Sequence, residues 1–146
     1  MPIFMNFPDI TGEATTPSGD QGWIEVLSFS WGASAPAVVG GSGIRPGKPS
    51  VSDFSVEKTL DSASVEIFQK CVTGAKETPV LIEFYKTGAA AKYLEFTLGN
   101  ALITSYQLSG SSGVPTESIS LAFVKIEMSY TSQIATNNTE DFGFAV

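Results

Sequence analysis

The sequence contains no histidine, so the main candidates for acid–base chemistry are its fifteen carboxylates, and it has a single thiol. Without imidazole, the usual acid–base catalyst, the usual catalytic triad and the commonest zinc ligand are missing. Paired carboxylates could still hydrolyse glycosides, which keeps a hydrolase as an alternative. The acids are scattered, however, and two are adjacent only at Glu140 and Asp141, in a polar stretch. The sequence therefore predicts a protein that is not an enzyme and has no catalytic, cofactor or metal site.

Two other patterns resemble reactive sites. Cys71 falls on the apolar stripe of a predicted helix, which favours a small buried side chain over a nucleophile. Gly47 and Lys48 look like the end of a phosphate-binding loop, but Pro49 stands where the metal-binding hydroxyl belongs, and no predicted helix follows. Neither pattern predicts a site, and a lone cysteine fits a reducing compartment.

The composition describes a folded protein whose surface is poor in charge. Hydrophobic residues make up 42% and charged residues 16% of the chain, against about 25% charged residues in typical soluble domains. Either other subunits cover part of the surface, or the surface is rich in uncharged polar side chains. The net charge of −7 and the pI of 4.4 argue against nucleic acid and anionic membranes as partners.

The start of the sequence shows no targeting signal. The first basic residue is Arg45, whereas a secretory signal begins with a basic segment. No apolar run approaches the ~20 residues of a membrane span. We expect a single domain over residues 1–146 that is cytoplasmic and inserts into no membrane. If the protein leaves the cell, we expect secretion without a signal peptide.

The elements that must position any functional surface are mostly strands. Residues 23–31 form the clearest predicted strand, and the alternation places Trp23 and Trp31 on the same, apolar face. Ser28 and Ser30 share the other parity. Their small hydroxyl side chains predict that this half of the second face meets water or a polar surface.

Two segments depart from the strand pattern. Residues 33–49 are rich in glycine and proline and predict a long extended loop, although Val38, Val39 and Ile44 make it more apolar than a plain linker. Residues 61–73 predict the one good helix, with Asp61 or Ser62 as its cap and Gly74 after its last turn. We expect this helix to pack on a sheet by a stripe of apolar side chains: Val65, Phe68 and Val72, with Ile67 and Cys71 alongside.

Seven or so strands and one helix predict a mainly β fold, built as a barrel or sandwich of two sheets. A series of short fragments, in order along nearly the whole chain, also resembles one protein family. The fragments are Gly12 and Glu13, Ser30 to Gly32, Val51, Asp53, Phe54 and Lys58, Asp61 and Ser64, Cys71 and Gly74, Thr97 and Leu98, Leu102 to Tyr106, Glu117 to Leu121, Phe123, Lys125 to Glu127, Tyr130, and a closing Phe142 to Phe144. The series is similar to the Hcp family (haemolysin co-regulated proteins), the tube proteins of type VI secretion systems.

The resemblance implies a compact β-barrel of two packed antiparallel sheets, one flanking helix at about residues 61–73 and an extended loop at about residues 33–49. It implies homohexameric rings, closed by strand pairing between subunits, that stack into a tube and carry effectors in the lumen. A spike protein, a contractile sheath and a baseplate are the further partners implied. The same resemblance implies secretion through the type VI apparatus.

Two sets of functional residues follow from this resemblance. The family places the strand at residues 23–31 along the channel, so we expect Ser28 and Ser30 to face the lumen. The loop should reach the neighbouring ring through a heterologous contact. The residues expected to make this ring-stacking contact are Val38, Val39, Ile44 and Arg45.

A different class of function stays open as the alternative. Two tryptophans and ten phenylalanines could line the site of a monomeric β-sandwich that binds carbohydrate or a small apolar ligand. Most of these aromatic residues occupy strand positions on apolar faces. Such positions favour packing in the core over an exposed binding site.

Overall fold

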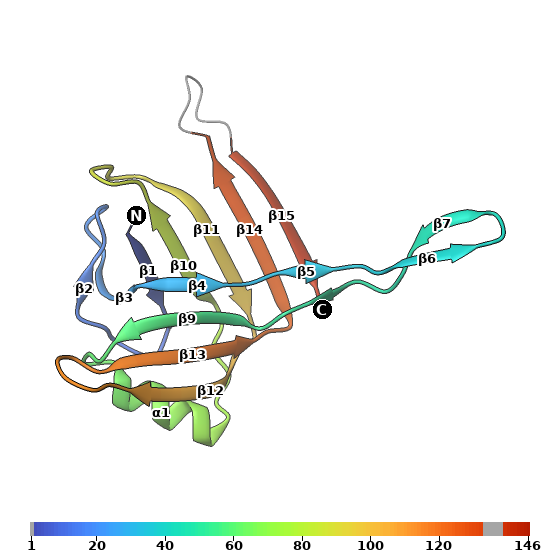
Figure 1. Cartoon of the computed structure of the whole chain (residues 1–146). Helices are drawn as coiled ribbons and strands as arrows, with labels where there is room; N and C mark the ends of the chain where they lie inside the picture. The colour runs from blue at the N-terminus through green and yellow to red at the C-terminus, as the bar shows by residue number, and fades with distance from the viewer. Residues whose placement is uncertain (1, 133–138) are drawn as a thin grey trace.

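The computed structural model describes residues 2–132 and 139–146, which form antiparallel sheets with one short helix (Figure 1). The larger sheet has seven strands, in the spatial order β15 (Thr139–Ala145), β14 (Lys125–Thr131), β11 (Lys92–Gly99), β10 (Val80–Tyr85), β1 (Ile3–Asn6), β3 (Gln21–Val26) and β2 (Ala14–Thr15). The smaller sheet has four, in the order β12 (Leu102–Ser109), β13 (Thr116–Ala122), β9 (Phe54–Thr59) and β4 (Ser28–Ser30). The prediction of a mainly β protein of antiparallel sheets is confirmed.

The two sheets are joined where the chain passes from β3 into β4. Leu27 lies between these strands, and its backbone N–H donates to the carbonyl oxygen of Glu57 on β9 at 2.7 Å. In Figure 1 the strands of the smaller sheet run across those of the larger one. The outer strands β15 and β12 do not pair with each other in the described part of the chain. The sheets therefore form the two packed antiparallel sheets that the resemblance implies, and in the described part of the chain they do not close into a barrel.

The core lies between the sheets and is rich in aromatic rings. Alternation along β9 turns Phe54 and Val56 inward, while Phe84 and Phe96 face them from the larger sheet. The ring centroid of Phe96 lies 5.1 Å from that of Phe54, 6.0 Å from that of Phe84 and 5.5 Å from that of Trp31. Phe96 thus connects both sheets, and fully burying such a side chain contributes about 1.5–3 kcal/mol.

The helix α1 (Ser64–Thr73) begins three residues later than the predicted start at residue 61. The turn before it is held by a reciprocal pair of hydrogen bonds. The backbone N–H of Ala63 donates to Asp61 Oδ1, and the backbone N–H of Asp61 donates to Ser64 Oγ, both at 3.0 Å. The N-cap residue of α1 is Ala63, and no side chain caps the helix, so the prediction of Asp61 or Ser62 as the cap is wrong; Asp61 holds the preceding turn instead. Gly74 ends the helix in the left-handed conformation, with φ of 66°.

The apolar stripe of α1 is only partly buried. Ile67 is fully buried and Cys71 half-buried, because this line of the helix packs against β12. Val65, Phe68 and Val72 instead expose 76%, 53% and 68% of their surface. Phe68 still contacts the sheet, because its ring centroid lies 5.9 Å from that of Tyr106 on β12. The prediction that the stripe packs on the sheet is therefore wrong for Val65 and Val72 only. Successive residues of a helix are about 100° apart around its axis, so Val65, Phe68 and Val72 lie about 100° away from the line of Ile67 and Cys71. No helix in residues 2–132 and 139–146 is long and apolar enough to cross a membrane.

Residues 33–49 form most of a two-stranded arm that projects from the body (Figure 1). At the base of the arm β5 (Ala33–Ser34) pairs with β8 (Ser50–Val51), and farther out β6 (Ala37–Gly40) pairs with β7 (Gly43–Pro46) to form a hairpin. The predicted extent is right, but the strand pairing was not predicted. The pairing was missed because the strands of the arm are only two to four residues long, and because glycine and proline in this segment are typical of loops.

Candidate functional site

Small polar side chains cover the outer face of the smaller sheet. Residues that are directly opposite in neighbouring antiparallel strands point to the same face. One row across β4, β9, β13 and β12 is formed by Ser30, Ser55, Ser120 and Ser105. The next row is formed by Ser28, Glu57, Ser118 and Gln107. We call these eight residues the hydroxyl face; it carries one ionisable group, Glu57.

The two predicted residues of this face, Ser28 and Ser30, are both exposed on the edge strand β4. The Ser28 hydroxyl donates to Glu57 Oε2 at 3.4 Å, and the hydroxyls of Ser55 and Ser120 are 3.2 Å apart. The members on β9, β13 and β12 were not predicted. Part of their signal is present in the sequence, since polar residues alternate with Phe54 and Val56 along β9 and with Ile119 and Leu121 along β13.

The opposite face of the same sheet contains a buried ion pair. Lys58 on β9 and Glu117 on β13 are registered partners in direct contact, and neither side chain is exposed. The Lys58 ammonium also donates to Asp61 Oδ1 at 2.9 Å, and Ser64 Oγ donates to Glu117 Oε1 at 2.9 Å. The Tyr106 hydroxyl donates to the other carboxylate oxygen of Glu117. This cluster ties the sheet to the start of α1, and its central pair is out of reach of a substrate.

The same surroundings raise the pKa of Tyr106 to about 12. Burial is the largest cause, followed by the hydrogen bond to Glu117 and by the negative charges of Glu117 and Asp61. The phenol therefore keeps its proton at neutral pH and remains a donor to Glu117. This contact could not be predicted from local sequence patterns, since Tyr106 and Glu117 are eleven positions apart and on two different strands.

A second group of acids lies on the larger sheet. Glu83 on β10 and Glu95 on β11 are registered partners, and the Lys92 ammonium donates to them at 3.1 Å and 2.9 Å. The Tyr85 hydroxyl donates to Glu83 at 2.7 Å. Burial is the main cause that raises the pKa of Glu95, and Lys92 opposes it. Because the lysine bridges both acids, they do not flank an open space for a sugar as a hydrolytic pair does.

The hairpin presents two faces with different chemistry. The register pairs Val38 with Arg45 on one face and Val39 with Ile44 on the other. Val39 and Ile44 expose 77% and 75% of their surface, and Val38 exposes 39%. The structure thus brings the four predicted arm residues together at the outer end of the arm, clear of the body.

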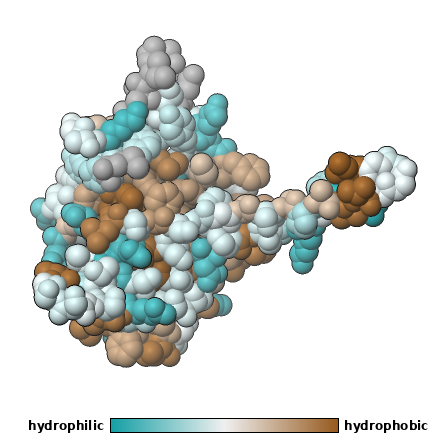
Figure 2. All heavy atoms as spheres, in the orientation of Figure 1, coloured by the Kyte–Doolittle hydropathy of each residue, from teal (hydrophilic) through white to brown (hydrophobic). Residues whose placement is uncertain are grey.

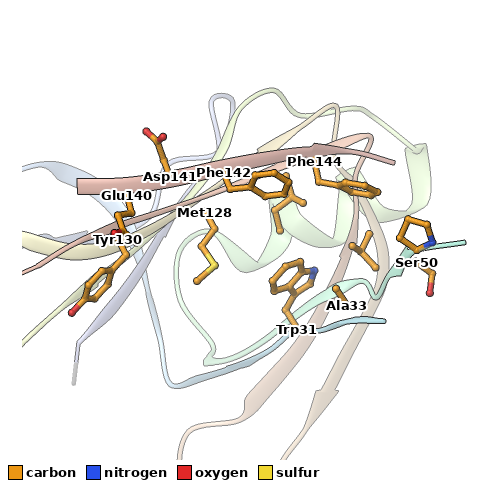
Figure 3. Close-up of a pocket in the computed structure, with 12 residues that line it drawn as sticks. Trp31, Ala33, Ser50, Met128, Tyr130, Glu140, Asp141, Phe142 and Phe144 are labelled. Carbon is orange, nitrogen blue, oxygen red and sulfur yellow. The ribbon is translucent and has the colours of Figure 1, made fainter. Parts of the chain in front are cut away.

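An apolar pocket lies where the base of the arm passes the β14–β15 end of the larger sheet. Its volume is 410 Å³. In Figure 3, Phe142 and Phe144 lie on one side of the pocket, Trp31 and Ala33 on the other, and Met128 between them. This pocket was not predicted from the sequence, although the closing segment with Phe142 and Phe144 was part of the family resemblance.

A family model described as "Type VI secretion system effector, Hcp" matches residues 4–130. The chain belongs to the Hcp family. The match includes the hydroxyl face, the buried ion pair and the arm, so the resemblance drawn from the fragment series is confirmed. The expectation of a type VI secretion tube protein is confirmed with it.

Solved Hcp structures share this fold over almost the whole chain. Hcp2 from Salmonella typhimurium is 27% identical with a TM-score of 0.79, and the match covers 100% of this chain and 96% of that one. Hcp1 from Salmonella typhimurium is 23% identical with a TM-score of 0.83, covering 99% and 93%. A type VI secretion system effector from Yersinia pestis is 23% identical with a TM-score of 0.81, covering 99% of each chain. A comparison with curated proteins gave no match.

The surfaces that this Hcp chain offers are therefore a polar sheet face, a protruding arm and an apolar pocket. None of them has the donor set of a metal site: in residues 2–132 and 139–146, no three His, Cys, Asp or Glu side chains are grouped to hold a metal ion. The chemistry they support is non-covalent contact.

Proposed function

We propose that this Hcp chain is a non-enzymatic structural subunit whose homohexameric rings stack into a tube that carries effectors. The family match over residues 4–130 carries the proposal. In this proposal residues 1–146 act as one domain, and the partners are other copies, a spike protein, a contractile sheath, a baseplate and effectors. The subunit is made in the cytoplasm and leaves through the type VI apparatus. It needs no cofactor, binds no nucleic acid and inserts into no membrane.

The hydroxyl face is the proposed wall of the lumen. Its eight residues include six serines and one ionisable group, so water hydrates it well and no strong charge holds a passing protein. Ser28 and Ser30 lie on its edge strand, β4, and belong to this wall. A weakly charged wall suits a channel that must accept different cargoes and release them again, because strong charge complementarity selects particular partners.

Assembly depends on backbone groups and side chains that the fold of a single chain leaves exposed. The outer strands of both sheets leave backbone groups free for strand pairing with a neighbouring subunit, which supports ring closure. The arm leaves Val38, Val39, Ile44 and Arg45 free for a contact with the next ring. Both contacts are heterologous, since each joins one surface to a different surface of the next copy.

The experiment that tests ring formation is the native mass by light scattering, with negative-stain images of the same sample. We expect the mass of a hexamer of 15.4 kDa chains and particles with a central hole. A 15.4 kDa monomer at high concentration would contradict the tube subunit. It would favour the monomeric β-sandwich, whose carbohydrate or apolar ligand would then be sought in the aromatic pocket.

Replacing residues 38–45 with a short Ser-Gly link should abolish stacking and leave single rings intact. The change removes the exposed apolar side chains of the hairpin, and losing their burial weakens the ring-to-ring contact by more than about tenfold. Tube length in negative stain and ring mass by light scattering measure the two effects separately. Ser42→Ala at the hairpin tip is the matched control and should stack normally. Undiminished tubes from the shortened arm would contradict the assignment of the arm to stacking.

Placing a large cation on the hydroxyl face should change cargo retention without changing the ring. In Ser30→Arg the guanidinium projects from β4 into the proposed lumen, so we expect the fraction of effector retained by purified rings to change several-fold. Gln69→Arg, on the exposed side of α1, is the control and should leave retention unchanged. Rings of altered mass would instead place Ser30 in a contact between subunits.

A further inference from the structure

The apolar face of the hairpin has nothing to pack against in its own chain. Ala37 and Pro46 are registered partners, as are Val39 and Ile44, so four apolar side chains share one face. A two-stranded ribbon cannot bury either face by itself. Figure 2 shows a group of hydrophobic residues near the outer end of the arm, away from the body. Their exposure marks a surface that is made to meet another one.

The same chain has an apolar pocket with no occupant from its own fold. Met128 and Phe142 are registered partners on β14 and β15, and they expose 42% and 72% of their surface. They lie on the inner face of the larger sheet, next to buried Ile126, where the smaller sheet does not cover them. Trp31, across the pocket, contacts Phe96 of the core. The pocket is therefore a part of the core that is left open.

The arm of the same copy cannot fill this pocket. Ala33, Pro49, Ser50 and Val51, at the base of the arm, form part of the pocket wall. From this base the arm runs away from the body to the hairpin (Figure 1). A hairpin that enters the pocket must come from a second copy.

Charge at the two surfaces is complementary. Arg45 is the one arginine of the sequence; it follows Ile44 on β7, and its side chain starts from the other face of the hairpin, at the margin of the apolar face. Glu140 is at the rim of the pocket, beside Tyr130 in Figure 3, and is exposed. An apolar segment with a cation therefore faces an apolar pocket with a carboxylate at its edge, and such a match sets orientation and partner choice.

We propose that the hairpin of one copy inserts its Val39 and Ile44 face into the pocket of the next copy, while Arg45, on the other face of the hairpin, lies outside the pocket and reaches toward Glu140 at its rim. The inference rests on the proposed function, because it names the receiving surface for the arm of a stacking tube subunit. The hairpin and the pocket lie on different parts of one chain, so each copy can offer its hairpin to one neighbour and its pocket to another, and the contact propagates from copy to copy. It also covers the open part of the core at Phe142.

Cysteine cross-linking of the full-length chain tests this contact directly. Two preparations are made in a Cys71→Ser background, one with Ile44→Cys and one with Met128→Cys. They are mixed, assembled and oxidised, and we expect a disulfide-linked pair of chains. The matched control replaces Met128→Cys with Ser129→Cys, which lies on the other face of β14 and should not cross-link. Equal cross-linking of both pairs, or none in assembled tubes, would overturn the proposal.

Substitution in the pocket separates this inference from the proposed function. Met128→Lys puts an ammonium in the pocket, where it opposes insertion of the apolar face, so stacking should weaken by at least about tenfold. Ser129→Lys should stack as the parent chain does. If the shortened arm abolishes stacking while Met128→Lys does not, the arm stacks at another surface and this inference fails alone. If the shortened arm stacks normally, the proposed role of the arm fails. Normal stacking of Met128→Lys together with quenching of Trp31 fluorescence by the apolar dye N-phenylnaphthylamine would assign the pocket to a small ligand.

Discussion

Replacing Lys58 with methionine is expected to lower the free energy of unfolding by about 3–5 kcal/mol, because it leaves the buried carboxylate of Glu117 without its counter-charge. Glu117 then keeps only the hydrogen bonds from Ser64 and Tyr106. Asp61 also loses its contact with Lys58 at the start of the helix. Urea unfolding followed by tryptophan fluorescence, at a concentration where variant and parent have the same oligomeric state, measures the difference.

The double variant with Lys58→Met and Glu117→Leu is the decisive control for that prediction. Apolar side chains in place of both charges remove the uncompensated carboxylate, and such replacements are often neutral or stabilising. We therefore expect the double variant to recover most of the lost stability. A double variant as unstable as Lys58→Met would show that shape, and not buried charge, explains the loss.

Phe96→Ala should cost about 3–5 kcal/mol of stability, since it leaves a cavity in the middle of the core. Its ring contacts aromatic rings of both sheets, namely Phe54, Phe84 and Trp31. The two sheets are joined covalently at only a few points, so this aromatic cluster does much to hold them together. Thermal or urea unfolding measures the change.

Two variants calibrate the effect of Phe96→Ala. Phe96→Leu fills part of the space and should lose clearly less stability. Phe142→Ala removes a ring that is 72% exposed and should change the stability of the unassembled chain by no more than about 0.5 kcal/mol. A loss after Phe142→Ala as large as after Phe96→Ala would mean that the pocket is packed and not open.

Local patterns predicted much of the fold because each depends on nearby residues. Alternation along β9 and β13 gives the faces of the smaller sheet, and Gly74 gives the end of the helix. The start and the buried line of the helix were less accurate. Val65 and Val72 are apolar but exposed, whereas Ile67 is buried and Phe68 reaches Tyr106 on β12, so the stripe drawn from the sequence was too wide.

The candidate site was predicted only where a single strand reveals it. Ser28 and Ser30 were found because they alternate with apolar residues on one strand. To predict the whole hydroxyl face, one must also know how β4, β9, β13 and β12 pair, and this register depends on contacts between residues that are distant in the sequence. The pocket is harder to predict than the hydroxyl face. Trp31 and Phe142, which line it from opposite sides, are 111 positions apart in the sequence.

The pairing of β4 with β9 also decides how the arm would bear tension. One strand of the arm continues from β4 and the other leads into β9, and these two strands pair with each other through Ser28 to Ser30. A pull along the arm therefore draws β4 and β9 out together. Against β13, to which β9 is paired over six positions, that pull acts along the strands. The ladder is loaded in shear, so its hydrogen bonds resist together and do not open one after another. A tube subunit pulled by its neighbour would thus transmit the force into the core before its arm peeled away.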